Sequence, residues 1–146
     1  MLPEFRDLRI RQLNRVLGPY MQLPKIPRPT QGWLRAVREV CGLSLADVAG
    51  RLGRKRQLVA SLEKSEATDR ITINSLRRVA EAMECELVYY LRPKCGSFEQ
   101  LALHLAREVV RPDILAVEHS MALEDQAVGS VDEKIDEEAA RLLKRR

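Results

Sequence analysis

Three adjacent cations, Arg54, Lys55 and Arg56, stand just before an apolar segment with helical spacing. Neighbouring positive charges repel one another, so this cluster favours a polyanionic partner outside the fold, and DNA is the first candidate. The alternative is a solvated basic helix with no partner. Val59 and Leu62 recur at helical spacing after the cations, so the same stretch also supplies apolar contacts to a core.

Charge is distributed unevenly along the chain of 146 residues, whose formal net charge is +4. Residues 1–64 hold 13 Lys and Arg against 5 Asp and Glu, whereas residues 97–146 hold 7 against 11. The basic half is suited to a polyanion, which would repel the acidic half. We therefore expect two functions on one chain.

Several classes of protein are disfavoured by the composition. Cys41, Cys85 and Cys95 are odd in number and lie far apart, and His104 and His119 have no ligand-like spacing, so we expect neither a disulfide framework nor a metal site. Glycine-rich phosphate loops and nucleophile motifs are absent, which argues against an enzyme and gives no reason to expect a cofactor. There is no apolar run of membrane-spanning length, so a cytoplasmic protein is expected.

The first part of the chain reads as helices separated by breaks. An amphipathic N-terminal helix is predicted in 1–20, ending near Gly18 and Pro19, and a proline-rich linker in 21–30. Short helices follow in 31–84, with Ser44 and Thr72 as N-caps. Their expected buried residues are Leu34, Val37, Cys41, Val48, Ala49, Leu52, Val59, Leu62, Leu76, Val79, Ala80 and Met83.

Residues 85–93 alternate between apolar and polar with period two, which predicts a β-strand. A single strand cannot satisfy its backbone groups, and no second strand is evident, so we expect pairing with a second copy of the chain. The dimerisation residues would be Leu87, Val88, Tyr89, Tyr90 and Leu91. The alternative is an extended segment packed on its own helices.

Residues 97–146 return to helical periodicity. The first predicted apolar stripe comprises Phe98, Leu101, Leu105 and Val109, and that helix is expected to end at Arg111 and Pro112. A second stripe includes Ile114, Val117 and Met121. A third comprises Val131, Ile135, Ala139 and Leu142.

The stretch "LSLADVAGRLGRKRQLVASLEKSE" resembles the helix-turn-helix of phage-repressor-type (Xre/Cro) regulators. Small residues (Ala49), a turn glycine (Gly53) and apolar positions together carry the resemblance. The chain departs from this family in two places. Leu45 opens a helix where Gln is common, and in the turn Arg54 and Lys55 stand where an apolar residue and Ser are usual. We expect Arg54 to point outward and contact phosphate.

This resemblance implies a second helix that enters the major groove and reads base edges. Carried over, the base-reading residues are Arg56, Gln57, Ala60, Ser61 and Lys64. The phosphate-contacting residues are Ser44, Arg54, Lys55, Thr72 and Asn74. Paired recognition helices in a homodimer would require an inverted-repeat operator in double-stranded DNA.

Beyond the helix-turn-helix, "GWLRAVREVCGLSLADVAGRLG", "ITINSLRRVAEAMECELVYYL" and "EHSMALEDQ" resemble the mobile mystery protein A family. The resemblance implies an antitoxin-like regulator that represses its own operon and is encoded beside a Fic-domain protein, an AMP-transferase. Ser120 and Glu124 match the Ser/Thr-x-x-x-Glu spacing of Fic-inhibitory helices, although Asp125 replaces the usual Gly or Asn. The alternative for this spacing is a solvated helix face.

The expected fold is therefore all-α. It comprises a helix-turn-helix bundle in 31–84, one dimerising strand in 85–93 and a C-terminal helical region in 97–146. A competing functional hypothesis is a stand-alone dimeric repressor whose C-terminal helices serve only dimerisation.

Overall fold

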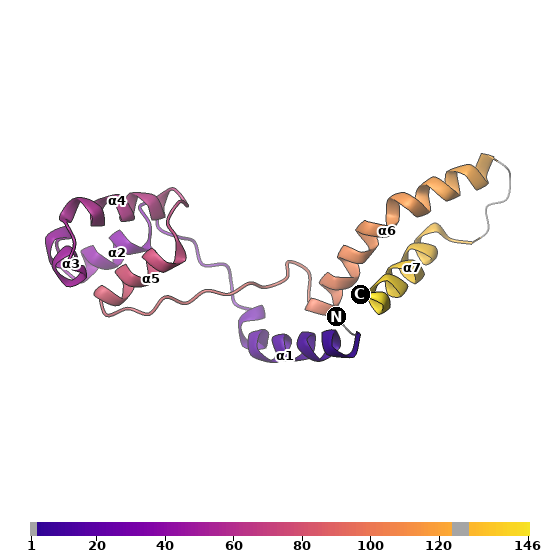
Figure 1. Ribbon diagram of the computed structural model, residues 1–146, viewed down its shortest axis with the longest axis horizontal. Coiled ribbons are helices and arrows are strands. Elements are labelled where there is room, and N and C mark those ends of the chain that lie inside the picture. Colours follow the sequence, from indigo (N-terminus) through magenta and orange to yellow (C-terminus); the bar gives the residue numbers. More distant parts are fainter. Residues whose placement is uncertain (1–2, 124–128) are drawn as a thin grey trace. The chain divides into compact units, whose positions relative to one another are not determined.

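The computed structural model describes residues 3–123 and 129–146, which contain seven helices and no strand. The all-α prediction is confirmed (Figure 1). The helices are α1 (Pro3–Met21), α2 (Trp33–Val40), α3 (Leu45–Leu52), α4 (Arg56–Ala67), α5 (Ile73–Ala82), α6 (Phe98–Leu123) and α7 (Val131–Arg145). They form two compact units, one of residues 24–89 and one of residues 1–23 with 90–146.

Local capping sets both ends of α3 and the start of α5, as the sequence predicts. At the start of α3 the Asp47 amide donates to the Ser44 hydroxyl (3.1 Å), while the Asp47 carboxylate accepts from the Ser44 amide (2.7 Å). Gly53 ends α3 with φ 62°, a left-handed conformation that costs glycine little. Thr72 caps α5 by accepting from the Ser75 amide at 3.1 Å.

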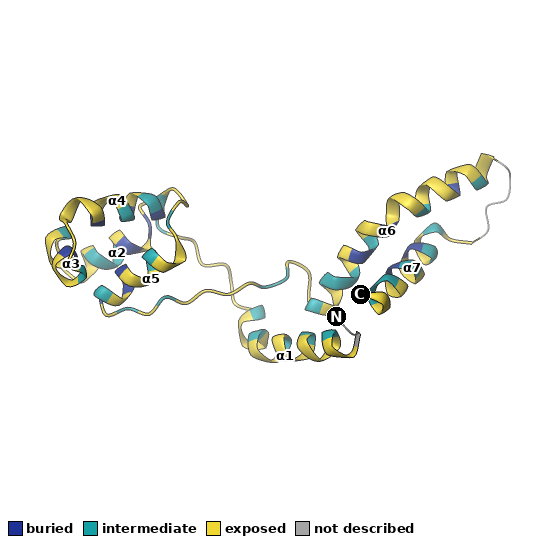
Figure 2. Ribbon diagram, in the orientation of Figure 1, coloured by how far each residue is buried: buried dark blue, intermediate teal, exposed yellow. Residues whose placement is uncertain are grey.

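The core of this unit lies among α2, α3, α4 and α5 (Figure 2). Its buried residues are Leu34, Val48, Ala49, Val59, Val79 and Met83. All six were expected. The prediction for Cys41 is wrong, because this residue lies just past α2 and is exposed. A helical stripe loses its register where the helix ends.

A tertiary contact that the sequence did not predict fixes the start of α2. The Glu66 carboxylate, at the far end of α4, accepts from the backbone amides of Trp33 (2.7 Å) and Leu34 (2.9 Å). Those amides have no partner within their own helix, and a carboxylate at a helix N-terminus is also favoured by the helix dipole. Gly32 lies so close that an added Cβ would stand 2.5 Å from Glu66 Oε2.

The other unit has a smaller core. Ala106 and Val110 of α6 pack on Ile135 and Ala139 of α7, and all four are buried. Side-chain hydrogen bonds hold α1 against these helices: Asn14 Nδ2 donates to Glu99 Oε2 at 2.7 Å, and Arg6 donates to the Leu143 carbonyl.

Two predicted helix ends are wrong, and both involve proline. Helix α1 continues through Gly18 and Pro19 to Met21. Arg92 donates to the carbonyls of Tyr20 and Met21 (both 3.4 Å), which satisfies groups that a helix end leaves free. Helix α6 likewise continues through Pro112, because residues before and after it, Val110 and Ile114, both pack on α7. Tertiary packing outweighs the hydrogen bond that proline removes.

The predicted strand in 85–93 is not present: these residues have no regular secondary structure. A β-ladder requires a second strand, and none occurs among the described residues of this chain.

The first C-terminal stripe is only partly covered within the described chain. Phe98 and Leu101 are half-buried, whereas Leu105 and Val109 remain 55% and 52% exposed. Helix α6 carries a second apolar face, centred on Ala106 and Val110, and it is this face that packs on α7. The residues of the third stripe, in α7, are buried or half-buried.

Candidate nucleic-acid interface

Helix α4 presents one face to the core and the opposite face to solvent. Val59, Glu63 and Glu66 are buried on the inner face. The five residues predicted to read bases are all exposed, and their spacing places them on one side of the helix. They are Arg56, Gln57, Ala60, Ser61 and Lys64. The helix therefore carries hydrogen-bond donors, an amide and a methyl group outward on a single surface.

The N-terminus of α4 is open. Lys55 is its N-cap residue in an extended conformation, and no side chain caps the helix there. The first amides of a helix lack internal partners and attract anions. The cations of Lys55 and Arg56 stand at the same end, so the backbone and the side chains favour negative charge together.

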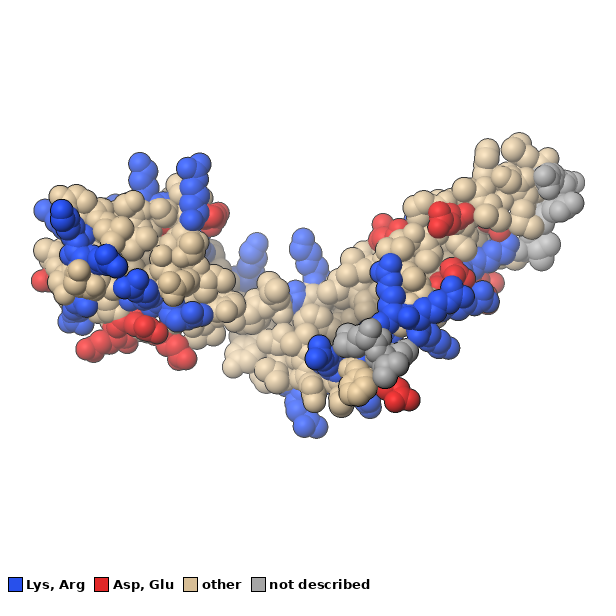
Figure 3. Space-filling model, viewed as in Figure 1, with Lys and Arg blue, Asp and Glu red and all other residues tan. Residues whose placement is uncertain are grey.

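Within the 24–89 unit, four of the eight carboxylates are paired with other arginines. Ion pairs within 4.0 Å join Arg28 to Asp69, Arg35 to Glu39, Arg38 to Glu63 and Arg51 to Glu84. No described carboxylate pairs with Arg54, Lys55 or Arg56. Figure 3 shows Lys and Arg side chains gathered over the helices of this unit. Part of the positive charge left over therefore lies on the turn and the first turn of α4, and more lies on α5, at Arg77 and Arg78.

The predicted phosphate-contacting residues differ in how free their side chains are to contact a phosphate. The Ser44 hydroxyl is engaged with the Asp47 carboxylate at 2.6 Å, and that negative charge opposes a phosphate at the start of α3. Hydrogen bonds from the side chain and the backbone amide of Ser44 lower the pKa of Asp47, so the carboxylate stays ionised near neutrality. At α5 the Thr72 hydroxyl is used in its cap, while Asn74 is exposed.

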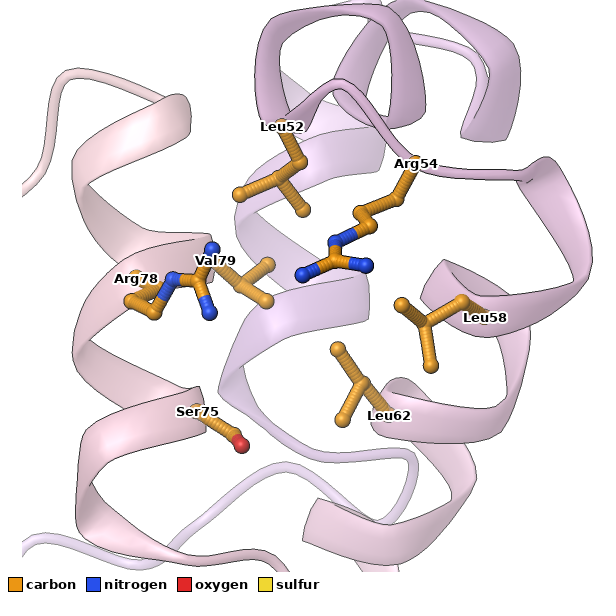
Figure 4. Close-up of a pocket in the computed structure, with 7 residues that line it drawn as sticks. All are labelled: Leu52, Arg54, Leu58, Leu62, Ser75, Arg78 and Val79. Atoms are coloured by element: carbon orange, nitrogen blue, oxygen red, sulfur yellow. The ribbon is translucent and has the colours of Figure 1, made fainter.

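Arg54 is exposed, and its side chain also lies against apolar residues of the unit. Its guanidinium lies over a hollow of about 280 Å³ whose apolar walls include Leu52, Leu58, Leu62 and Val79 (Figure 4). The guanidinium of Arg78, from α5, reaches the same hollow, which Ser75 also lines. The sequence analysis missed Arg78 and Ser75, although their position one turn apart on α5 could have placed them on one face with Asn74.

The predicted dimerisation residues and the predicted inhibitory pair lie outside the surface of α4. Val88, Tyr89 and Leu91 of the dimerisation set are 70%, 62% and 84% exposed, Tyr90 is exposed to a lesser degree and Leu87 is half-buried. Ser120 is exposed near the end of α6, where its hydroxyl donates to the Ala116 carbonyl at 3.3 Å. Its predicted partner Glu124 lies outside the described residues, so the structure does not place this pair.

Residues 3–123 and 129–146 contain no cluster of three His, Cys, Asp or Glu side chains suited to a metal ion. None of the helices described has the length and apolar character needed to cross a bilayer.

Comparison with known protein families, with curated proteins and with solved structures gave no match.

Proposed function

We propose that this protein is a sequence-specific DNA-binding transcriptional regulator whose helix α4 reads the major groove. The main support is the exposed face of α4, where Arg56 and Gln57 stand beside Ala60 and Ser61 with an open helix N-terminus behind them. Such side chains match base edges in the major groove, and the cations of the turn match phosphates.

Phosphate contacts are assigned to Lys55 and to the surface shared by Arg54, Arg78 and the start of α5. Arg78 and Ser75 join the predicted set because they line the same hollow as Arg54. Ser44 contributes less, since Asp47 lies against its hydroxyl.

The test is selection from a random duplex library by the purified full-length chain, followed by fluorescence anisotropy on the selected duplex and on a scrambled duplex of the same composition. A regulator of this kind should prefer the selected duplex by about 10³-fold or more at physiological salt. Equal affinity for both duplexes would reject sequence-specific reading. Selected sites should be inverted repeats if the protein binds as a homodimer.

We also assign residues 87–91 to contacts between copies of the chain. These residues combine apolar and aromatic side chains with a backbone that has no regular pairing within the described chain. A second copy would provide the missing backbone partners.

The acidic C-terminal region is proposed to neutralise a Fic-type AMP-transferase, making the protein the antitoxin of a toxin-antitoxin pair in the cytoplasm that represses its own operon. Support comes from the sequence resemblance and from a hollow of about 570 Å³ between α6 and α7, which carries both apolar and acidic residues. Its lining includes Val109, Ile114, Val117, Met121, Asp113 and Glu118. Ser120 and Glu124 are the proposed inhibitory pair.

Co-expression with the product of the neighbouring gene tests this role. The expected result is a stable complex in which AMP transfer is suppressed and is released by Glu124→Gly. If AMP transfer stays suppressed in this variant, Ser120 and Glu124 are not the inhibitory pair. If no complex forms, the second candidate is favoured, a stand-alone dimeric repressor. The exposed apolar residues of α1 and α6 favour that second candidate, because they suit self-association.

A further inference from the structure

The hollow at Arg54 has apolar walls contributed by α3, α4 and α5. Leu58 is 41% exposed on its rim, while Leu52 and Leu62 are half-buried. Val79 also lines the hollow and belongs to the buried core of the 24–89 unit, so the hollow reaches from the surface to that core. Covering these walls with an apolar group would be favourable, because it would remove them from water.

Two guanidinium groups reach the same hollow. Arg54 enters it from the turn before α4 and Arg78 enters it from α5 (Figure 4). The ion pairs within 4.0 Å in the 24–89 unit use four other arginines, so no described carboxylate neutralises either group. Two like charges directed at one place repel each other, and an anion between them would replace that repulsion with attraction.

Ser75 adds a neutral hydrogen-bond donor to the wall formed by α5. Its hydroxyl oxygen accepts from Thr72 Oγ1 at 3.0 Å, and the Ser75 hydroxyl proton has no acceptor among the described residues. A carboxylate in the hollow would accept from this hydroxyl as well as from the guanidinium groups. Hydrogen bonds to an ionised acceptor are stronger than those between neutral groups.

The size and the walls of the hollow limit the ligand. An apolar cavity of about 150 Å³ holds benzene. The hollow at Arg54, of about 280 Å³, leaves room for one ring or a short alkyl chain together with an acid group. A phosphate of DNA would match the charges but leave the apolar walls uncovered, and an uncharged apolar molecule would leave the guanidinium groups unpaired. The two features together select an organic acid with a small apolar body.

We propose that this hollow binds a small organic carboxylate, with the acid group between Arg54 and Arg78 and the apolar body against Leu58 and Leu62. The ligand acts as an effector that weakens DNA binding, because it occupies the two arginines assigned above to DNA phosphates. The binding site depends only on the hollow. Its regulatory effect rests on the proposed function.

Titrations of the isotope-labelled full-length chain, followed by amide chemical shifts, test the site with two probes, hexanoate and phenylacetate. Both should shift the amides of Leu58, Ser75 and Arg78. Each probe should bind at least about tenfold more tightly than acetate, which lacks the apolar body. Each should also bind at least about tenfold more tightly than its own primary amide, which lacks the charge.

Substitutions separate the charges from the walls. Arg54→Gln and Arg78→Gln should each weaken binding of the two carboxylates by about tenfold and leave binding of the amides unchanged, because only the charge is removed. Arg77→Gln is the matched control, since Arg77 is the neighbouring exposed arginine of α5 and does not line the hollow. Leu58→Ala should weaken carboxylates and amides alike. Circular dichroism should show unchanged helix content in all four variants.

Fluorescence anisotropy on the selected duplex tests the effector role. Saturating phenylacetate should lower the DNA affinity of the wild type by at least about fivefold relative to sodium chloride of equal ionic strength, since a neutralised arginine no longer displaces counterions from DNA. Arg78→Gln should respond much less to the same concentration of phenylacetate.

The outcomes distinguish the site, its effector role and the regulator function. The site would be overturned if neither probe bound, or if Arg77→Gln and Arg78→Gln lost equal affinity. Acetate or inorganic phosphate binding as tightly as the probes would also overturn it and make the hollow a phosphate contact alone. Probe binding without any change in DNA affinity would overturn the effector role. A chain that binds both probes but prefers no duplex would support the site and count against the proposed function alone.

Discussion

Nε of Arg38 lies 2.5 Å from Oε1 of Glu63, and the two side chains are only 12% and 9% exposed. This ion pair joins α2 to the inner face of α4. The hydrogen-bonded carboxylate raises the pKa of Arg38 above its usual value, so the guanidinium stays charged. Arg38 also donates to the Leu43 carbonyl at 3.1 Å, which ties the loop before α3 to the same contact. The orientation of α4 therefore depends on a charged pair as well as on the apolar core.

Removal of one partner should destabilise the fold. Glu63→Ala leaves the Arg38 charge in a nearly buried position, and we expect a loss of about 2–3 kcal/mol, somewhat below the value for fully buried pairs. Urea unfolding monitored by circular dichroism measures this loss. Glu39→Ala removes an exposed carboxylate that pairs with Arg35 and lies 4.0 Å from Arg38, and it should have a much smaller effect because Glu63 still neutralises Arg38. The double variant Arg38→Met and Glu63→Leu should recover most of the lost free energy of unfolding. Equal losses in Glu63→Ala and Glu39→Ala would contradict this account.

Arg56→Ala should reduce binding to the selected duplex by about 1–3 kcal/mol and relax one base position, because a bidentate contact to guanine would be lost. Anisotropy titrations on duplexes that differ at single positions provide the measurement. Arg77→Ala removes an exposed arginine of α5 and serves as the charge-matched control. If Arg56→Ala weakens the selected and scrambled duplexes equally, Arg56 contacts phosphate and reads no base.

Arg54→Leu should separate folding from DNA binding. Leucine would fill the hollow lined by Leu52, Leu58 and Val79 and remove a positive charge from beside Arg78, so the thermal midpoint should rise. Affinity for all duplexes should fall together, with the slope of log K against log salt reduced by about one. Unchanged affinity and salt slope would remove Arg54 from the phosphate set, and a lowered midpoint would show that the hollow does not accept an apolar side chain.

The α3 cap should make stability depend on pH. The pKa of Asp47 is lowered in the folded state, chiefly by the Ser44 hydrogen bonds, so its contribution is present above the ordinary aspartate pKa and is lost as pH falls through the lowered value. Thermal midpoints of wild type and Asp47→Asn should differ at pH 7 and converge as the pH falls below the lowered pKa of Asp47. A difference that stays constant across this range would exclude ionisation of Asp47 as its cause.

Sequence alone determined the helix-turn-helix unit well, because its signals are local. Ser44 with Asp47, Gly53 and Thr72 are short-range capping and turn residues, and the structure places them where the spacing predicts. The inner face of α4 follows from the 3.6-residue period, so the exposure of Arg56, Gln57, Ala60, Ser61 and Lys64 could also be foreseen.

Only the tertiary structure decided the features that depend on distant residues. Arg92 extends α1 past Pro19, contacts on both sides of Pro112 keep α6 continuous, and Glu66 caps a helix more than thirty positions away. Periodicity identified the apolar stripe of Leu101, Leu105 and Val109 in α6. It could not show that α7 would cover a different face of this helix, that of Ala106 and Val110. A pattern records that a face is apolar; which neighbour buries it depends on packing between segments that are remote in the chain.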